Sequence, residues 1–209
     1  DAVRNLLQSN PNLVDPGDVE RSGNMPLMLA ASAGQTEIVQ ILLEKNATVA
    51  ARRPDNATAL MCAAEKGQAE IVRLLLAKNA AVNTQNTKGI TPLLFAAQGG
   101  HFEAARALLT KKANVNAQRD DGSTPLIAAT RSGNLALVKL LLENSADVKA
   151  ADKDGETSLQ AAVLLGNGDI AKLLLDNGAA INAKNNKGET PLWIAVTKNK
   201  PEMVKLLLT

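Results

Sequence analysis

Residues 90–117 read ITPLLFAAQGGHFEAARALLTKKANVNA, and this stretch decides the fold. Thr91 can cap a helix with its hydroxyl, and Pro92 suits the first helical position, where its missing N–H costs no hydrogen bond. The helix that they open is short and apolar and ends before Gly100, a residue typical of a turn. A second, amphipathic helix and a polar loop complete the stretch. The pattern therefore predicts two helices joined by a turn and followed by a projecting loop.

The same pattern recurs along the chain with a constant spacing of 33 residues. Its anchor is the residue before Pro-Leu or the equivalent pair, which falls at Met25, Thr58, Thr91, Thr124, Thr157 and Thr190. A period of 33 in which Thr-Pro-Leu opens one helix and a glycine closes it is the signature of the ankyrin repeat. The chain resembles the ankyrin-repeat family over nearly its whole length.

The resemblance implies an all-α fold with short β-hairpin loops, an ankyrin-repeat α-solenoid of six helix-pair units plus an N-terminal half unit. We expect a single domain over residues 1–209, in which residues 1–24 form a partial and atypical first repeat. The repeats start near residues 25, 58, 91, 124, 157 and 190. Their first helices are expected at 26–33, 59–66, 92–99, 125–132, 158–165 and 191–198. Their second helices carry an aliphatic stripe that predicts a buried face.

Two loop positions of each repeat are expected at positive φ, which favours glycine and then asparagine. The turn between the helices has a glycine in five repeats and Asn199 in the last. The position after the second helix holds Asn46, Asn79, Lys112, Ser145 and Gly178. The resemblance implies glycine at that position, so Lys112 and Ser145 are its weak members. Asn56 takes the place of the glycine that ends the other polar hairpins.

The composition limits the class of partner and the compartment. The 23 basic and 21 acidic residues give a net charge of +2, which favours neither nucleic acid nor an anionic membrane as the partner. The single cysteine excludes an internal disulfide framework and favours a reducing compartment, so we expect a cytoplasmic protein. No apolar run approaches the roughly 18 residues of a membrane span, and no signal peptide is visible. Because Asp1 is not a start methionine, we expect a fragment or a processed form.

The residues for catalysis are missing from the sequence. A nucleophile, a base and an orienting group must lie within reach of one another. The chain has one histidine, His101, and one cysteine, Cys62, and the helix pattern places them at opposite ends of first helices in adjacent repeats. We interpret His101 as structural and Cys62 as a small buried hydrophobic residue. Metal-ligand spacings and phosphate-binding glycine loops are also missing, so we expect no enzyme, no metal and no cofactor.

One departure from the family pattern is consistent. The resemblance implies a histidine after Thr-Pro-Leu, where this chain has Met28, Met61, Leu94, Ile127, Gln160 and Trp193. Apolar packing replaces a hydrogen bond to the loop at all of these positions except Gln160. We therefore expect Trp193 in the core rather than in contact with a ligand.

The resemblance implies a monomeric protein-binding module that holds another protein or a peptide on the concave surface of its hairpin tips and first helices. Carried over position by position, the candidate contacts are Arg52, Arg53, Lys66, Lys88, Ile90, Gln98, Asp120, Arg131, Lys153, Glu156, Leu164, Leu165, Lys187 and Lys198. The pair Leu164 and Leu165 is open to two interpretations, a binding anchor between Arg131 and Lys198 or a part of the core. The alternative function is the targeting segment of a larger enzyme or effector whose chemistry lies outside this chain.

Overall fold

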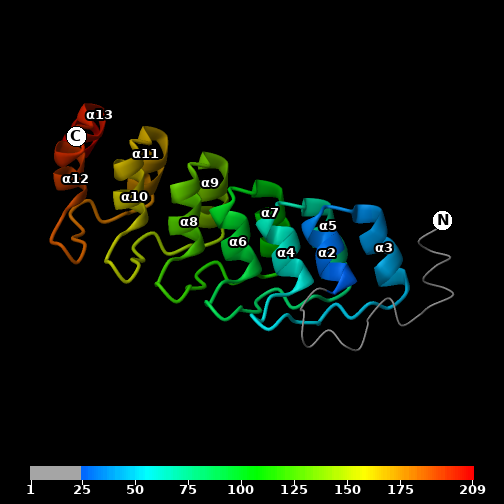
Figure 1. The fold of residues 1–209 in the computed structure, drawn as a ribbon. Helices are drawn as coiled ribbons and strands as arrows, with labels where there is room; N and C mark the ends of the chain where they lie inside the picture. Colours follow the sequence, from blue (N-terminus) through cyan, green and yellow to red (C-terminus); the bar gives the residue numbers. More distant parts are fainter. Residues whose placement is uncertain (1–24) are drawn as a thin grey trace. The chain divides into compact units, whose positions relative to one another are not determined.

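The computed structural model describes residues 25–209, and the predicted partial repeat at 1–24 lies outside the described residues. Within this part of the chain, α-helices alternate as the first and second members of pairs (Figure 1). The first helices are α2 (Pro26–Ser32), α4 (Ala59–Glu65), α6 (Pro92–Gln98), α8 (Pro125–Ser132), α10 (Ser158–Leu165) and α12 (Pro191–Thr197). The second helices are α3 (Thr36–Glu44), α5 (Ala69–Ala77), α7 (Phe102–Thr110), α9 (Leu135–Glu143), α11 (Gly168–Asp176) and α13 (Pro201–Leu208). Each first helix begins at its predicted residue and ends within one residue of the predicted end, which confirms the all-α prediction.

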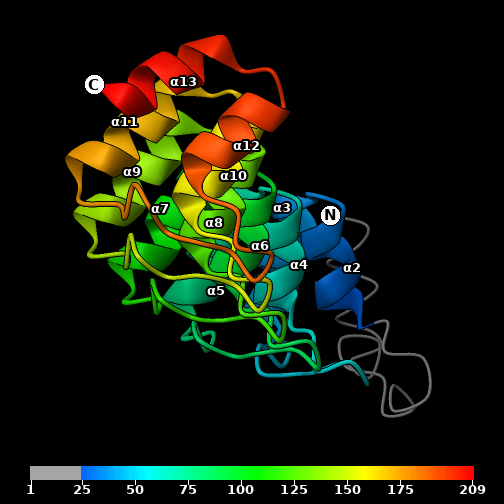
Figure 2. The same cartoon turned by 90° about the vertical axis from the view of Figure 1, so that its left-hand side faces the viewer.

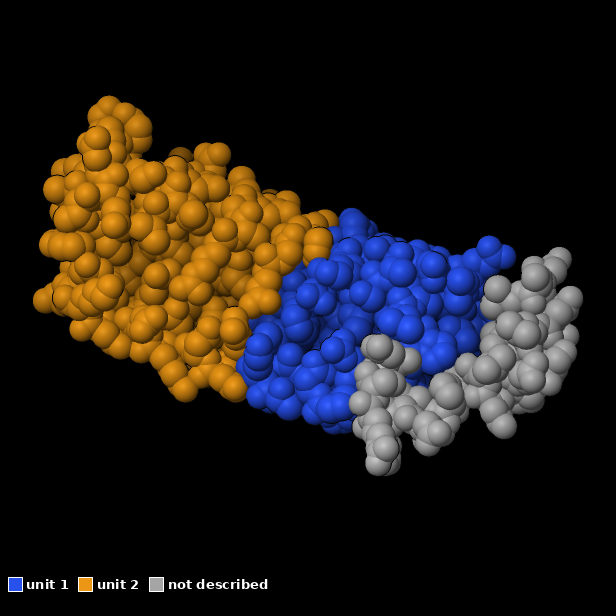
Figure 3. Space-filling model, in the orientation of Figure 1, with its two compact units in different colours: residues 1–96, 103–113 blue, residues 97–102, 114–209 orange. Residues whose placement is uncertain are grey.

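The chain forms two compact units (Figure 3). Unit 1 comprises the described residues up to 96 together with 103–113, and unit 2 comprises 97–102 and 114–209. In unit 1, α2 packs on α4, and α3 packs on α5. In unit 2, α8, α10 and α12 pack in series, and α9, α11 and α13 stand beside them as a second row (Figure 2). Each unit is therefore built from a layer of first helices and a layer of second helices.

Small and aliphatic side chains make the core between these layers. Ala64 and Val72 are fully buried in unit 1, and Ala129 and Leu141 are fully buried in unit 2. Alanines on the first helices allow close approach of neighbouring helices, toward the lower end of the ~8–10 Å packing range. The leucines of the second helices supply most of the buried apolar area, at roughly 1.5–3 kcal/mol for each fully buried side chain. None of the helices in residues 25–209 combines the length and the hydrophobicity that a membrane crossing needs.

The predicted threonine caps start the first helices. The hydroxyl oxygen of each cap accepts a hydrogen bond of 3.2–3.3 Å from the backbone N–H three residues later, at Thr58, Thr91, Thr124, Thr157 and Thr190. Such a bond satisfies one of the N–H groups that a helix start leaves without a partner. Met25 has no side-chain cap, and α2 begins on Pro26 alone. Local side-chain chemistry thus explains why these helices begin where they do.

The loops are hairpin turns, but they contain no β-strand within the described residues, so the expected β-hairpins are only partly correct. The turn at 152–156 is closed by Asp152 N–H, which donates to Glu156 O at 3.0 Å. Its only ladder-type pairing is an isolated bridge between Ala151 and Thr157. The loop is too short to form further strand pairing, because Thr157 already caps the next helix, α10. Successive hairpins within unit 2 are joined to each other, as by Asn186 N–H, which donates to Asp154 O at 2.9 Å.

The predicted left-handed positions are confirmed. The non-glycine residues with positive φ in the described part of the chain are Asn46, Asn56, Asn79, Lys112, Ser145 and Asn199. The glycines between paired helices also have positive φ, as at Gly133 with 73°. At these positions the chain turns and reverses direction between one short helix and the next.

Lys112→Gly is expected to stabilise the protein by a few tenths to about 1 kcal/mol. Lys112 has φ 61°, where a residue with a Cβ is strained and glycine is not, although glycine also loses more chain entropy on folding. The measurement is the urea midpoint at unchanged slope. Lys111→Gly is the matched control, because it removes the same charge at the neighbouring residue, which is not in the left-handed region. This variant should lower the free energy of unfolding by about 0.5–1 kcal/mol. A lower midpoint for Lys112→Gly would contradict the prediction.

Candidate functional site

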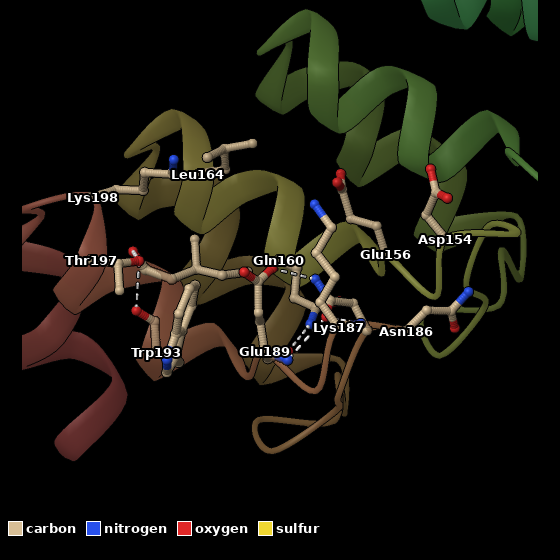
Figure 4. A pocket seen from close by; sticks show the side chains of 12 residues that line it. Asp154, Glu156, Gln160, Leu164, Asn186, Lys187, Glu189, Trp193, Thr197 and Lys198 are labelled. Carbon is tan, nitrogen blue, oxygen red and sulfur yellow. Dashed lines mark hydrogen bonds between the residues drawn. The ribbon is translucent and has the colours of Figure 1, made fainter.

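The candidate residues lie at the hairpin tips and at the ends of the first helices. All are exposed except Ile90, which is buried, and Glu156, which is half-buried. The structure brings four of them together in unit 2, where Glu156, Leu164, Lys187 and Lys198 line one groove of about 400 Å³ (Figure 4). Gln98 and Arg131 line a smaller hollow of about 170 Å³ in the same unit.

The groove in unit 2 lies between α10, α12 and the hairpins that precede them. Its floor is apolar, made by Leu164 at 42% exposure, Trp193 at 49% and the buried Ile194. Trp193 and Thr197 on α12 and Leu164 on α10 all line this groove (Figure 4). An aromatic side chain that is half-exposed beside a leucine offers a partner a large apolar contact.

The expectation that Trp193 belongs to the core was wrong. The equivalent residues Ile127 and Gln160 are fully buried, because the next hairpin covers them. Gln160 shows this contact directly, since its Nε2 donates to Ala183 O at 3.2 Å and to Glu189 O at 2.8 Å. Trp193 itself is 49% exposed in the part of the chain that the structure describes. The side chain that periodicity assigns to the core is therefore available at the surface.

Arg131 does not stand free beside the groove. Its Nη2 atom forms ion pairs with Asp152 Oδ2 at 2.8 Å and with Glu156 Oε1 at 2.9 Å. The Asp152 carboxylate is almost buried and also accepts hydrogen bonds from Asp154 N and Glu156 N. Burial lowers the pKa of Arg131, but the hydrogen bond to Asp152 and the charge of Glu156 outweigh burial and raise the pKa overall. Arg131 thus stabilises the hairpin at 152–156. Because its guanidinium is already paired with two carboxylates, it is less able to pair with a carboxylate of a partner.

The lysines of the groove differ from Arg131 in this respect. Within the part of unit 2 that the structure describes, the ammonium groups of Lys187 and Lys198 form no ion pair shorter than 4.0 Å. Glu189 shares the groove and accepts a hydrogen bond from Asn185 Nδ2 at 2.7 Å. The groove therefore combines an apolar floor with two lysines outside ion pairs and with the carboxylates of Asp154, Glu156 and Glu189.

The two leucines at the end of α10 are exposed, which contradicts the interpretation that they belong to the core. Leu164 is 42% exposed and Leu165 is 50% exposed. Lys198 lines the same groove as Leu164, whereas Arg131 and Leu165 do not line it. Their role as a binding anchor stays a prediction.

Unit 1 holds a second hollow of about 300 Å³, to which Arg53, Lys88 and Ile90 contribute. Ile90 is only 6% exposed, so its place among the surface contacts needs correction. Ala57 and Ser123, which also precede a helix cap, are buried as well, at 7% and 4% exposure. Cys62 lines the same hollow and is buried as predicted, at 8% exposure. Burial raises the pKa of the Cys62 thiol, against the opposing effect of the Arg53 guanidinium.

The remaining candidates are exposed and lie outside these hollows. They are Arg52, Lys66, Asp120, Lys153 and Leu165. Arg52 Nη1 donates to Asn56 Oδ1 at 2.9 Å and so supports its own hairpin.

No three side chains of the His, Cys, Asp or Glu type among residues 25–209 lie close enough to hold a metal ion. His101 follows the turn after α6, where its ring fills the space beside Gly99 that a Cβ would need. This close packing supports the structural interpretation of His101.

Trp193 is the residue of the groove that the sequence analysis missed. The available signal was its residue type, because it is the only tryptophan of the sequence. Asp154 also lines the groove and was not among the candidates.

Comparison with known proteins agrees with the repeat pattern. A family model described as ankyrin repeats in three copies matches residues 1–86, 76–152 and 146–209, and these matches together span the chain. A search of curated proteins gave no match.

Proposed function

Because the chain belongs to the ankyrin-repeat family, we propose that it is a protein-binding module whose main contact surface is the groove of unit 2. Ankyrin repeats are generally protein–protein interaction modules. The observation that carries the choice of surface is the half-exposed pair of Trp193 and Leu164 between Lys187 and Lys198. The partner is another protein or a peptide.

The chemistry of the groove supports an anchored contact. Interfaces draw most of their binding energy from a few apolar or aromatic anchors that polar groups surround. Trp193 and Leu164 supply such anchors, in a chain whose aromatic content is only 1%. Two lysines and three carboxylates line the groove, so a partner that presents charges of both signs would be oriented by them.

The same proposal covers the organisation of the protein. The repeats that start near residues 25, 58, 91, 124, 157 and 190 act as one domain over residues 1–209. The module works as a monomer in the cytoplasm, without a cofactor, without nucleic acid and without catalysis of its own. The nearly balanced charge and the single, buried cysteine support this part of the proposal.

Replacing Leu164 and Leu165 by serine tests the proposal. Immobilised wild type captures partners from a lysate, and each captured protein is then titrated against the purified variants. The double variant, and separately Trp193→Ala, should weaken binding about 30-fold or more, which corresponds to about 2 kcal/mol, while the melting temperature barely changes.

Leu135→Ser is the matched control. Leu135 is 40% exposed, close to the 42% of Leu164, but it begins the second helix α9 and lies outside the groove. Its replacement should leave binding unchanged. Equal losses for Leu135→Ser and the double variant, or no loss for either groove variant, would overturn the choice of this surface.

A further inference from the structure

A separate hollow lies in unit 1, on the layer of second helices rather than at the hairpins. It occupies about 250 Å³ between α5 and α7. Its floor includes Leu76, which is buried, together with Ala77 and Ala107. The rim carries the exposed side chains of Arg73, Arg106 and Lys111.

One alanine explains why the hollow exists at this place. Residues that stand at multiples of 33 from Ala107 are large and aliphatic in every other second helix, namely Ile41, Leu74, Leu140, Leu173 and Leu206. Ala107 lacks the outer carbons of those side chains, so the space that they fill elsewhere opens between α5 and α7.

The charges around the hollow are unequal. Three cationic side chains and a single carboxylate, that of Glu103, line it. Glu103 Oε2 accepts from Arg106 Nη2 at 2.6 Å and from Arg73 Nη2 at 3.3 Å, so one oxygen serves two guanidinium groups. Arg73 also donates through Nη1 to Glu70 Oε2 at 3.1 Å. The ammonium group of Lys111 has no ion pair within the described part of unit 1. The rim can therefore accept further carboxylates.

We propose that this hollow is a second docking site, which takes an acidic segment of a partner protein that carries a leucine. The leucine side chain enters the space over Ala107 and contacts Leu76, while neighbouring carboxylates pair with Arg106 and Lys111. Charge complementarity orients the segment, and the apolar floor distinguishes it from a simple polyanion. The site does not depend on the groove of unit 2 and is independent of the function proposed above.

The probe is a fluorescein-labelled peptide with two leucines flanked by glutamates, titrated by fluorescence anisotropy against the full chain. Ala107→Leu should weaken binding at least tenfold, because the added side chain fills the hollow. This variant is expected to fold, since leucine stands at the equivalent position in α9 and α11. Ala136→Leu adds the same side chain at an exposed position of α9, outside the hollow, and should leave binding unchanged.

Two charge variants shift the affinity in opposite directions if the rim is used as proposed. Lys111→Gln should weaken binding severalfold and reduce its salt dependence. Glu103→Gln should strengthen binding severalfold, because it removes the carboxylate that pairs with Arg106 and Arg73, while Arg73 keeps its pair with Glu70.

Several outcomes would overturn the proposal. Wild type that shows no saturable binding of the peptide up to millimolar concentration would do so, as would equal affinities for wild type and Ala107→Leu. Polyglutamate or a single-stranded oligonucleotide that binds as tightly as the leucine peptide would show general attraction of anions instead. Trp193→Ala should leave peptide affinity unchanged, which keeps failure of this site distinguishable from failure of the groove in unit 2.

Discussion

Gly155→Ala is expected to lower the free energy of unfolding by about 3 kcal/mol. Gly155 has φ 75°, and a Cβ there would lie 2.8 Å from Asn186 Oδ1, 2.9 Å from Asn186 N and 3.0 Å from Asn185 Cα. The left-handed conformation costs an alanine about 1–2 kcal/mol, and overpacking against backbone adds about 1–3 kcal/mol. The hairpin at 185–189 would have to move away, although it is bonded to the hairpin that contains Gly155. Urea unfolding monitored by circular dichroism measures the loss.

Gly188→Ala separates the two causes. Gly188 occupies the equivalent position of the next hairpin with φ 78°, but a Cβ there meets nothing within 4 Å. Its replacement should cost only the conformational part, about 1–2 kcal/mol. Asn56, at φ 63° in unit 1, shows that the conformation alone can be tolerated with a side chain. If Gly155→Ala and Gly188→Ala lower the free energy of unfolding equally, the clash of a Cβ with the neighbouring hairpin contributes nothing to the loss at Gly155.

Gln160→Leu is expected to destabilise unit 2 by about 2–3 kcal/mol, although leucine stands at the equivalent position of α6. The Gln160 side chain is fully buried, and its Oε1 accepts from Thr157 N at 2.9 Å. Its Nε2 donates to Ala183 O and to Glu189 O in the next hairpin. Leucine would leave the Thr157 N–H and Ala183 O without these partners, while Glu189 O would keep its bond from Asn185 N. A buried polar group that loses its partner costs about 1–3 kcal/mol.

Gln160→His provides the comparison for this prediction. An imidazole N–H can still donate to the hairpin, so the histidine variant should lose clearly less stability than the leucine variant. Thermal and urea unfolding of both proteins measure the difference. A leucine variant as stable as the wild type would show that the glutamine network contributes no net stability.

Residue types and repeat spacing predicted part of the candidate site. Leu164, Glu156, Lys187 and Lys198 were predicted as contacts from their repeat positions, and the structure places all four on one groove. Position alone could not show that Arg131 is already paired with Asp152 and Glu156. Pairing depends on which side chains of the next hairpin come within reach, and periodicity says nothing about that distance.

The sequence by itself determined the helix boundaries, the threonine caps and the positions with positive φ. These features rest on local interactions: the hydroxyl of Thr91 bonds three residues ahead, Pro92 sets the first helical φ, and the conformation at Lys112 follows from the end of α7. Each repeat contains all the residues that these features need. The 33-residue spacing then carries the same prediction to every repeat.

Only the tertiary structure decided burial, pairing and the shape of the surface. Trp193 is 49% exposed although the equivalent Ile127 and Gln160 are fully buried, and Ile90 is buried although its repeat position indicated a surface contact. The hollow beside Ala107 depends on the side chains of α5 as much as on its own helix. Burial is a property of a position together with its neighbours, and those neighbours belong to other repeats of the chain.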